Sequence, residues 1–298
     1  MAAVELSKSP PATRPRWRDY LEVTKPRVVA LMTFTVVVGM LLSSHGPVPW
    51  RPMLFGVTGI ALVAGAAAAI NHLVDRRLDA LMARTRGRPL PRGALGTRAV
   101  ALFAATLGAT GMALLLAFTN PLCALLTLAS LLGYAVVYSR FLKHATPQNI
   151  VIGGAAGAAP PLLGWVAITD RVDAGALLLF LIVFVWTPPH FWALAIHRRD
   201  DYAKAEVPML PVTHGVPFTA TRVLLYAVAL LPISLLPVAI GMSGPLYLVA
   251  ASALGLHFIG HAWRLRRDAR RAMPTFRFSI VYLFGLFAAL LADHYVPG

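Results

Sequence analysis

The chain has 298 residues, of which 58% are hydrophobic and 13% are charged, and its formal net charge is +15 at pH 7. One soluble core cannot bury so much apolar surface, so the composition excludes a soluble globular protein and indicates a membrane protein. The lone cysteine, Cys123, lies in an apolar run, which excludes disulfides within the chain and a thiolate metal cluster.

Residues 1–27 are polar and rich in proline and basic side chains, and they predict a short cytoplasmic arm with an interfacial helix near 17–23. A cleaved signal peptide also begins with basic residues, but the apolar segment that follows here is long and lacks a clear small-residue cleavage site. The arm contains Glu5, Asp19 and Glu22, which suit a mitochondrial transit peptide poorly. We therefore expect a retained first span and a bacterial inner membrane.

Residues 28–298 form the predicted membrane domain, because apolar stretches long enough to cross a hydrocarbon core of about 30 Å recur along them. These stretches lie near 28–44, 53–73, 98–118, 120–140, 149–168, 174–195, 220–241, 245–263 and 278–294. The pattern predicts an all-α, polytopic bundle of about nine transmembrane helices. The short connections at 119–120 and 242–244 predict antiparallel hairpins.

The basic residues follow membrane topology. If the N-terminus is cytoplasmic, all of the 27 Lys and Arg residues except Arg51 and Arg171 fall on inside segments. The net charge therefore reports orientation, and nothing is left to support a nucleic-acid partner. The same orientation puts the three distinctive segments, 71–93, 138–149 and 186–215, on the cytoplasmic side, which predicts one site facing the cytoplasm.

The first distinctive segment carries Asn71, Asp75 and Asp79, which share one face of a helix because they are spaced four residues apart. Carboxylates this close repel one another, and Mg²⁺ would turn the repulsion into ligation together with phosphate oxygens of a substrate. The arginines that follow could bind a diphosphate; they are Arg84, Arg86, Arg88 and Arg92. The alternative is a helix end whose aspartates pair with Arg76 and Arg77 while the other arginines anchor the topology.

The second segment, 138–149, is a short basic loop after a span. Lys143 could reach a diphosphate from this loop, with the aromatic ring of Tyr138 close by. The alternative is an ordinary loop that carries its positive charge only because it lies inside.

The third segment, 186–215, begins with Pro188 and Pro189 inside an apolar span, where they are expected to break the helix beside a cavity. His190 follows the expected break and could contact a polar group of a substrate or simply satisfy a freed carbonyl. Asp200 and Asp201 could supply a second cation site facing the first, and a solvated loop explains them as well. We favour the site, chiefly for Asp201.

These segments resemble the UbiA superfamily of membrane prenyltransferases. Residues 71–93, NHLVDRRLDALMARTRGRPLPRG, look like its first aspartate motif. The runs YSRFLKHATPQNIVIGGAAGAAPPLLGW and WTPPHFWALAIHRRDDYAKAEVPMLP look like signatures of the branch that farnesylates haem, and His72 agrees with that branch. In two respects the chain departs from expectation: Ala205 stands where quinone-pathway relatives have the second aspartate of their other motif, and His144 replaces a basic residue.

The resemblance implies a nine-helix bundle in the bilayer with a central cavity, and a catalytic centre of Asn71, Asp75 and Asp79 that binds Mg²⁺. Farnesyl diphosphate and protohaem IX would be the substrates, with haem O and diphosphate as products. The residues expected to bind the diphosphate are Arg84, Arg88, Arg92, Lys143 and Asp201, and those expected near the haem or the farnesyl chain are His72, Tyr138, His190 and Trp192.

Two rival functions stay open at this stage. One is a UbiA-type enzyme that alkylates an aromatic or quinone precursor. The other is a haem or lipid transporter, since polar residues and broken helices within the membrane are expected there too. If haem is the acceptor, a haem A synthase or a cytochrome oxidase assembly factor is an expected partner.

Overall fold

A computed structural model describes residues 16–44, 46–82 and 85–295, so most of the predicted arm and Arg84 lie outside the described residues. Within these ranges the chain is helical, without a strand. The elements are α1 (Trp17–Val23), α2 (Pro26–Leu42), α3 (Trp50–Leu81), α4 (Thr97–Phe118), α5 (Pro121–Leu132), η1 (Gly133–Leu142), α6 (Lys143–Ala145), α7 (Asn149–Thr169), α8 (Ala174–His197), α9 (Arg199–Lys204), α10 (Leu210–Thr213), α11 (Val216–Ala239), α12 (Pro245–Arg267), η2 (Ala269–Arg271) and α13 (Ala272–Tyr295).

The number of spans agrees with the sequence. Of the described helices, eight are long and apolar enough to cross a membrane, and a ninth span is completed if α1 and α2 count as one bent segment with an angle of 55°. All nine predicted stretches coincide with helices, although α3 continues eight residues past its predicted end at 73. That extension carries the aspartate motif beyond the apolar part of the helix.

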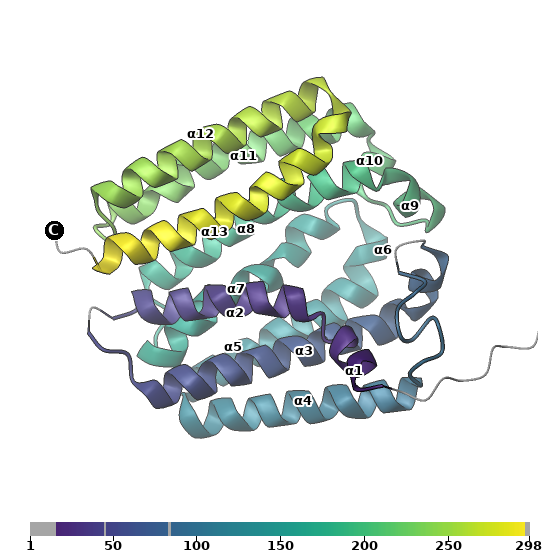
Figure 1. The fold of residues 1–298 in the computed structure, drawn as a ribbon, viewed down its shortest axis with the longest axis horizontal. Helices are drawn as coiled ribbons and strands as arrows, with labels where there is room; N and C mark the ends of the chain where they lie inside the picture. Colours follow the sequence, from purple (N-terminus) through teal and green to yellow (C-terminus); the bar gives the residue numbers. More distant parts are fainter. Residues whose placement is uncertain (1–15, 45, 83–84, 296–298) are drawn as a thin grey trace, which may run out of the picture.

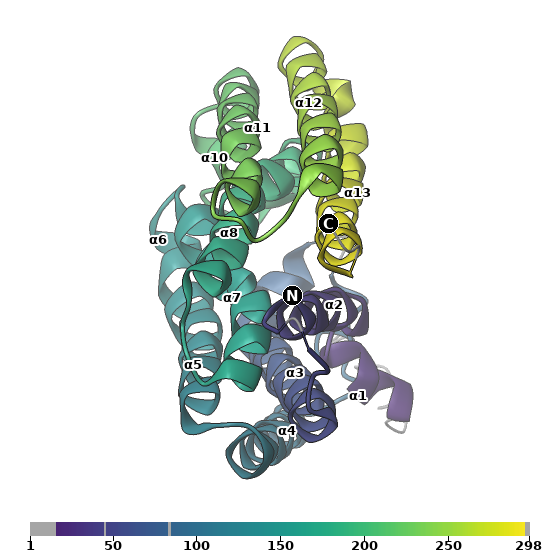
Figure 2. The same cartoon turned by 90° about the vertical axis from the view of Figure 1, so that its left-hand side faces the viewer.

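The helices form two groups that pack side by side (Figures 1 and 2). The first contains α2, α3, α4, α5 and α7, with α3 against α4 and α2 against α7. The second contains α8, α11, α12 and α13, in which α11 packs against both α8 and α12. The contacts of α7 with α8 and of α2 with α13 join the groups.

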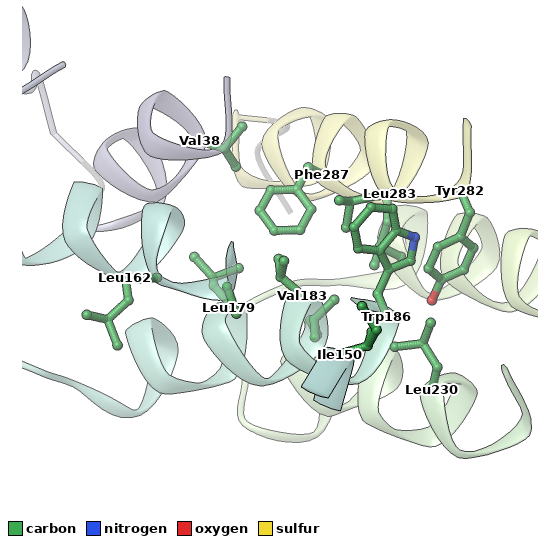
Figure 3. Close-up of a cluster of buried hydrophobic side chains, with 14 of the residues drawn as sticks. Val38, Ile150, Leu162, Leu179, Val183, Trp186, Leu230, Tyr282, Leu283 and Phe287 are labelled. Atoms are coloured by element: carbon green, nitrogen blue, oxygen red, sulfur yellow. The ribbon is translucent and has the colours of Figure 1, made fainter. Parts of the chain in front are cut away.

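The core lies where the groups meet, as Figure 3 shows: Val38 of α2 and Phe287 of α13 approach Leu179 and Val183 of α8. The indole nitrogen of Trp186 donates to the carbonyl of Ser279 at 2.8 Å, so the polar atom of this buried ring is satisfied. The core therefore fixes α8 against α13.

Two glycines let α2 and α7 pack closely. A Cβ on Gly39 would strike the backbone carbonyl of Pro161, and one on Gly164 would strike that of Val36. Small residues are what membrane helices use to bring their backbones together. This crossing forms one wall of the cavity described below.

The expected break at Pro188 and Pro189 is wrong, because α8 runs without interruption from Ala174 to His197 with both prolines inside. The same holds for Pro160 and Pro161 in α7. All four prolines are buried, and neighbouring helices on several sides hold each span in shape despite the missing N–H groups.

The distinctive segments gather at one end of the bundle, on the right in Figure 1, where α1, α6, α9 and α10 lie. We call this the site end. Helix α5 continues directly into η1, which is a π-helical stretch. The side chains of Tyr134, Tyr138 and Ser139 in this stretch lie in the interior of the site end.

Candidate active site

The predicted aspartate face exists on α3. Asn71, Asp75 and Asp79 follow one another at intervals of one turn, and their exposed fractions are only 4%, 5% and 3%. Two carboxylates buried this deeply need cationic or hydrogen-bonding partners, because desolvation of an unpaired charge is costly. The cations that pair with them, Lys143 and Arg88, come from two other parts of the chain.

Asp75 is paired with Lys143. The Nζ atom of Lys143 donates to Oδ2 of Asp75 at 2.7 Å, and the Nδ2 atom of Asn71 donates to the same oxygen at 2.9 Å. Asn71 also donates to Oγ of Ser139 at 3.0 Å and accepts from Nζ of Lys25 at 2.5 Å. The amide of Asn71 thus links an acid, a hydroxyl and an ammonium group.

Asp79 is paired with Arg88, whose Nη1 atom lies 2.9 and 2.8 Å from the two carboxylate oxygens. The hydroxyl of Thr85 donates to the backbone carbonyl of Asp79 at 2.9 Å and holds the following loop against the helix end. Among the described residues both acids pair with these cations and not with Arg76 and Arg77, which are exposed. The simple helix-end alternative is therefore not what the structure contains.

Arg92 points elsewhere. It forms ion pairs with Asp19 and with Glu22, the latter at 3.8 Å, and so joins the loop at 82–96 to α1. The ring of Tyr20 meets that of Phe103 edge-on at 5.1 Å, which places α1 against α4 as well. Of the predicted diphosphate-binding arginines that the structure describes, only Arg88 faces the aspartates.

Lys25 is a site residue that our sequence reasoning missed. It connects α1 to α2 in a left-handed conformation, with φ of 54°, and its Nζ atom reaches Asn71 and, at 3.4 Å, the hydroxyl of Tyr134. Such a conformation is costly for a residue with a side chain and persists where surrounding contacts enforce it. In the sequence, Lys25 is one more basic residue at the start of a span, and nothing there marks it as part of a site.

An apolar cavity of about 240 Å³ opens beside these groups. It lies between α2, α3, α5 with η1, α7 and α8, and its walls include Val28, Met32, Ile60, Leu131, Leu163 and Phe191. Lys25, Tyr134 and Tyr138 line it too, and the rings of the two tyrosines stack at 5.7 Å. We call this cavity the chamber. Through Lys25 and Tyr134 it adjoins the polar cluster around Asn71.

His190 and Trp192 do not line the chamber. Nδ1 of His190 is 2.7 Å from Oγ of Ser279, and its ring stacks on that of Trp186 at 4.2 Å. Trp192 is fully buried against Tyr226, with ring centroids 5.3 Å apart. Phe191, between them in sequence, is the aromatic residue that does face the chamber.

His72 and Asp201 lie near the aspartate face. His72 is buried beside Asn71, and neither of its ring nitrogens has a hydrogen-bond partner within the described part of the chain. Asp201 is 3.8 Å from Arg198 and lines a small cavity of about 160 Å³ with Arg86, Lys204 and the end of α3. The third segment thus approaches the first, as the sequence suggested.

The donor atoms at the aspartate face suit Mg²⁺, because Asp75 and Asp79 offer carboxylate oxygens to a hard cation, and the amide oxygen of Asn71, which accepts from Lys25 here, could add a third. Across the described ranges no group of three or more His, Cys, Asp or Glu side chains could hold a metal on its own. Mg²⁺ commonly takes one or two carboxylates and completes its shell with water and substrate phosphate. The residues therefore fit a cation that binds together with its substrate.

A helical membrane bundle with an apolar chamber beside paired acids and cations suits an enzyme that binds an apolar chain with a charged head, and the sequence profile of the UbiA prenyltransferase family matches residues 32–291. The chain belongs to this family. It is 64% identical over 286 residues to protoheme IX farnesyltransferase of Azotobacter vinelandii, covering 95% of this chain and 96% of that protein. It is 60% identical over 291 residues to protoheme IX farnesyltransferase 1 of Pseudomonas aeruginosa, covering 96% of each.

Solved structures share the fold at low identity. A digeranylgeranylglyceryl phosphate synthase superposes with a TM-score of 0.79 at 20% identity, covering 93% of this chain and 98% of that one. A UbiA homologue from Archaeoglobus fulgidus, bound to GPP and Mg²⁺, superposes with a TM-score of 0.62 at 17% identity, covering 91% and 99%.

Proposed function

We propose that this protein transfers a farnesyl group from farnesyl diphosphate to a vinyl group of protohaem IX, which yields haem O and releases diphosphate. The observation that carries the reaction type is the apolar chamber lying against the cluster of Lys25, Asn71 and Asp75. It offers an isoprenoid chain and its charged head adjacent sites. The acceptor follows from the identity of more than 60% with protoheme IX farnesyltransferases over nearly the whole chain.

The diphosphate head is bound, in this proposal, by the cations that now neutralise the acids. Lys143 and Arg88 turn from Asp75 and Asp79 toward phosphate oxygens, with Lys25 as a third donor. Asp75 and Asp79, assisted by Asn71, would hold Mg²⁺, which neutralises charge that develops on the leaving group.

Residues around this centre have supporting roles. Asp201 shares its cavity with Arg86 and Lys204 and would hold those cations near the mouth of the site. Arg92 acts through Asp19, because their ion pair ties the loop that carries Arg88 to the helix that precedes Lys25. The ring nitrogens of His72, which have no hydrogen-bond partner among the described residues, would contact the diphosphate or the haem.

The chemistry needs no covalent enzyme intermediate. The allylic C–O bond breaks, and its electron pair leaves with the diphosphate. The π electrons of a haem vinyl group form the new C–C bond to the farnesyl cation, and water then adds to the cation beside the porphyrin and loses a proton. The apolar walls of the chamber keep water away from the farnesyl cation until the C–C bond has formed. The ring faces of Tyr138 and Phe191 stabilise the positive charge of this cation.

The proposed location is the bacterial inner membrane, with the site end and the N-terminus in the cytoplasm. The support is the basic residues, which collect on segments of one side, and the position of all three distinctive segments at one end of the bundle. Haem O would pass from there to a haem A synthase or an oxidase assembly factor.

The test is an assay of purified protein with farnesyl diphosphate, haem and Mg²⁺, followed by the mass of the pigment. We expect haem to gain one farnesyl group and one hydroxyl group. If an aromatic or quinone precursor is alkylated and haem is unchanged, that precursor, and not haem, is the acceptor. Movement of haem across vesicles without a covalent product would instead establish a transporter.

A further inference from the structure

The turn that joins α12 to α13 at the site end carries a dense group of arginines that have no role in the proposed reaction (Figure 1). Six exposed arginines lie between residues 264 and 277, and Asp268 is the one acid among them. We call these six residues the arginine patch; they are Arg264, Arg266, Arg267, Arg270, Arg271 and Arg277.

The protein itself hardly neutralises the arginine patch. Asp268 accepts from Nε of Arg270 at 3.1 Å, and the other five arginines form no ion pair with any residue that the structure describes. Elsewhere at the site end, Arg88, Arg92 and Lys143 are each paired with an acid. The rule that inside segments are basic accounts for the sign of the patch, but it does not require so many unpaired guanidinium groups in one turn.

The turn holds these arginines on a fixed frame. The buried hydroxyl of Thr275 donates to the backbone carbonyls of Arg271 at 2.8 Å and of His261 at 3.2 Å, so it ties the start of α13 to the last turns of α12. The carboxylate of Asp268 accepts from the backbone N–H of Arg270 at 3.0 Å and closes η2. Because the backbone is already ordered, a ligand of the patch pays for the ordering of side chains alone.

The arginine patch lies at the level where lipid headgroups are expected. Trp263 is exposed, with the guanidinium group of Arg267 over its ring at 4.8 Å, and exposed tryptophans on spans mark the edge of a membrane. Leu256 lies two turns before Trp263 on the same face of α12, and it is exposed. Phe284, two turns after Arg277 on α13, is exposed too. Both helices therefore present apolar side chains to lipid directly below the arginines.

We propose that the arginine patch binds the headgroup of an anionic phospholipid, with the phosphate between Arg264, Arg267 and Arg271 and the acyl chains along α12 and α13. Basic clusters next to the end of a span attract anionic lipids, and the planar guanidinium group matches a phosphate with two parallel hydrogen bonds. A soluble acidic partner would cover the arginines alone, whereas a phospholipid also covers the apolar side chains below them. The chamber is lined by no residue of α12 or α13, so this site is separate from the proposed catalytic centre.

The test is native mass spectrometry of the full-length protein released from nanodiscs of phosphatidylcholine with a rising fraction of phosphatidylglycerol. The unsubstituted protein should retain phosphatidylglycerol in preference to phosphatidylcholine. The triple variant Arg264→Gln/Arg267→Gln/Arg271→Gln should lower the apparent affinity for phosphatidylglycerol about 10-fold to 100-fold, since each basic residue near the surface contributes severalfold.

A matched control removes the same charge at the same end of the bundle. Arg76→Gln/Arg77→Gln/Arg98→Gln replaces three exposed arginines outside the patch and should retain phosphatidylglycerol as the unsubstituted protein does. Equal losses in the two triple variants would show attraction by net charge without a defined site, and no loss in either would show that the patch binds no lipid. Each of these outcomes would overturn the proposal.

A second arm separates a lipid from other anions. Soluble glycerol phosphate and oligoglutamate lack acyl chains, so neither should displace phosphatidylglycerol from the unsubstituted protein at millimolar concentration. Displacement by the first would identify a site for free phosphate, displacement by the second would identify a surface for acidic proteins, and either would refute a lipid site. Neither farnesyl diphosphate nor haem enters this assay, so its outcome is independent of the proposed transferase activity.

Discussion

Lys143 and Asp75 are 68 positions apart in the chain and form an ion pair of 2.7 Å whose side chains are only 15% and 6% exposed. A pair this buried gains little net stability, because the attraction between the charges must first offset their desolvation. In the proposed reaction, both groups are already in place where the diphosphate and Mg²⁺ would bind. Removing either partner leaves a buried, uncompensated charge.

Asp75→Ala should therefore lower kcat about 10²-fold to 10³-fold or more, because it removes charge stabilisation at the leaving group. Membrane insertion should persist, since the span of α3 is unaffected. Turnover of purified variants measures the effect, with the exposed Asp200→Ala as the matched control. Activity of Asp75→Ala close to that of the control would eliminate Asp75 from the centre.

The substitution Lys25→Gly removes the ammonium group of Lys25 while it keeps the left-handed backbone conformation. Glycine adopts a positive φ without the strain of about 1 to 2 kcal/mol that a left-handed residue with a side chain carries, so the bend between α1 and α2 should be kept or improved. The ammonium group is lost, and KM for farnesyl diphosphate should rise about tenfold, roughly the 1.4 kcal/mol expected of one charged contact. Arg27→Gly, at the exposed neighbouring position, should leave KM unchanged. A normal KM in Lys25→Gly would show that Lys25 only shapes the backbone.

Removal of divalent cations should abolish activity, and Mg²⁺ should restore it. The reason is the pair of carboxylates of Asp75 and Asp79, whose oxygens suit a hard cation. The measurement is the initial rate during titration with EDTA and then Mg²⁺. The conservative Asp79→Asn should need more Mg²⁺ for half-maximal rate; full activity in excess EDTA would refute metal dependence.

Arg92→Ala and Asp19→Ala should have similar effects, and the double variant should be no worse than either. Their ion pair is half-exposed on the side of Arg92, so its contribution to stability should be below about 1 kcal/mol. Activity should fall severalfold, as loss of the tie loosens the loop that bears Arg88. A double-mutant cycle on kcat/KM measures the coupling, and additive effects would show that the two residues act separately.

Gly157→Leu should shift the preference of the enzyme from farnesyl toward geranyl diphosphate. Gly157 lines the chamber, and the space beside it is open, so leucine would fill volume that the longer chain needs. Competition between the two diphosphates gives the ratio of kcat/KM values, which we expect to change about 10-fold, as steric discrimination of this size allows. Gly133→Leu is the control, because Gly133 also has open space but lies outside the chamber.

The parts of the fold that sequence could predict are those with a local signal. Apolar length located the spans, and a spacing of four residues placed Asn71, Asp75 and Asp79 on one helix face. The partners of those residues had no local signal. Lys25 meets Asn71 across 46 positions and resembles any basic residue at a membrane boundary, so only tertiary packing identifies it.

The predicted helix break at Pro188 and Pro189 is wrong for a physical reason. Pro188 and Pro189 remove backbone donors, and from that loss the sequence suggested a broken helix and a cavity at His190. Packing on several sides keeps α8 intact, and His190 turns to Ser279 instead. Arg92 is the opposite case: it belongs to a convincing run of arginines, yet Asp19 lies closer to it than the aspartate face does.

The π-helical stretch η1 sets the rotation about the helix axis between the part of the site at Lys25 and the part at Asp75. It connects Tyr134, which faces Lys25, to Lys143, which faces Asp75, through wider turns than an α-helix has. Deletion of a single residue within 133–142 would turn everything after it about the helix axis, by somewhat less than the roughly 100° that one residue covers in an α-helix. Lys143 would then swing away from Asp75 while Tyr134 stayed in place, so the length of this short stretch is as much a part of the site as any side chain in it.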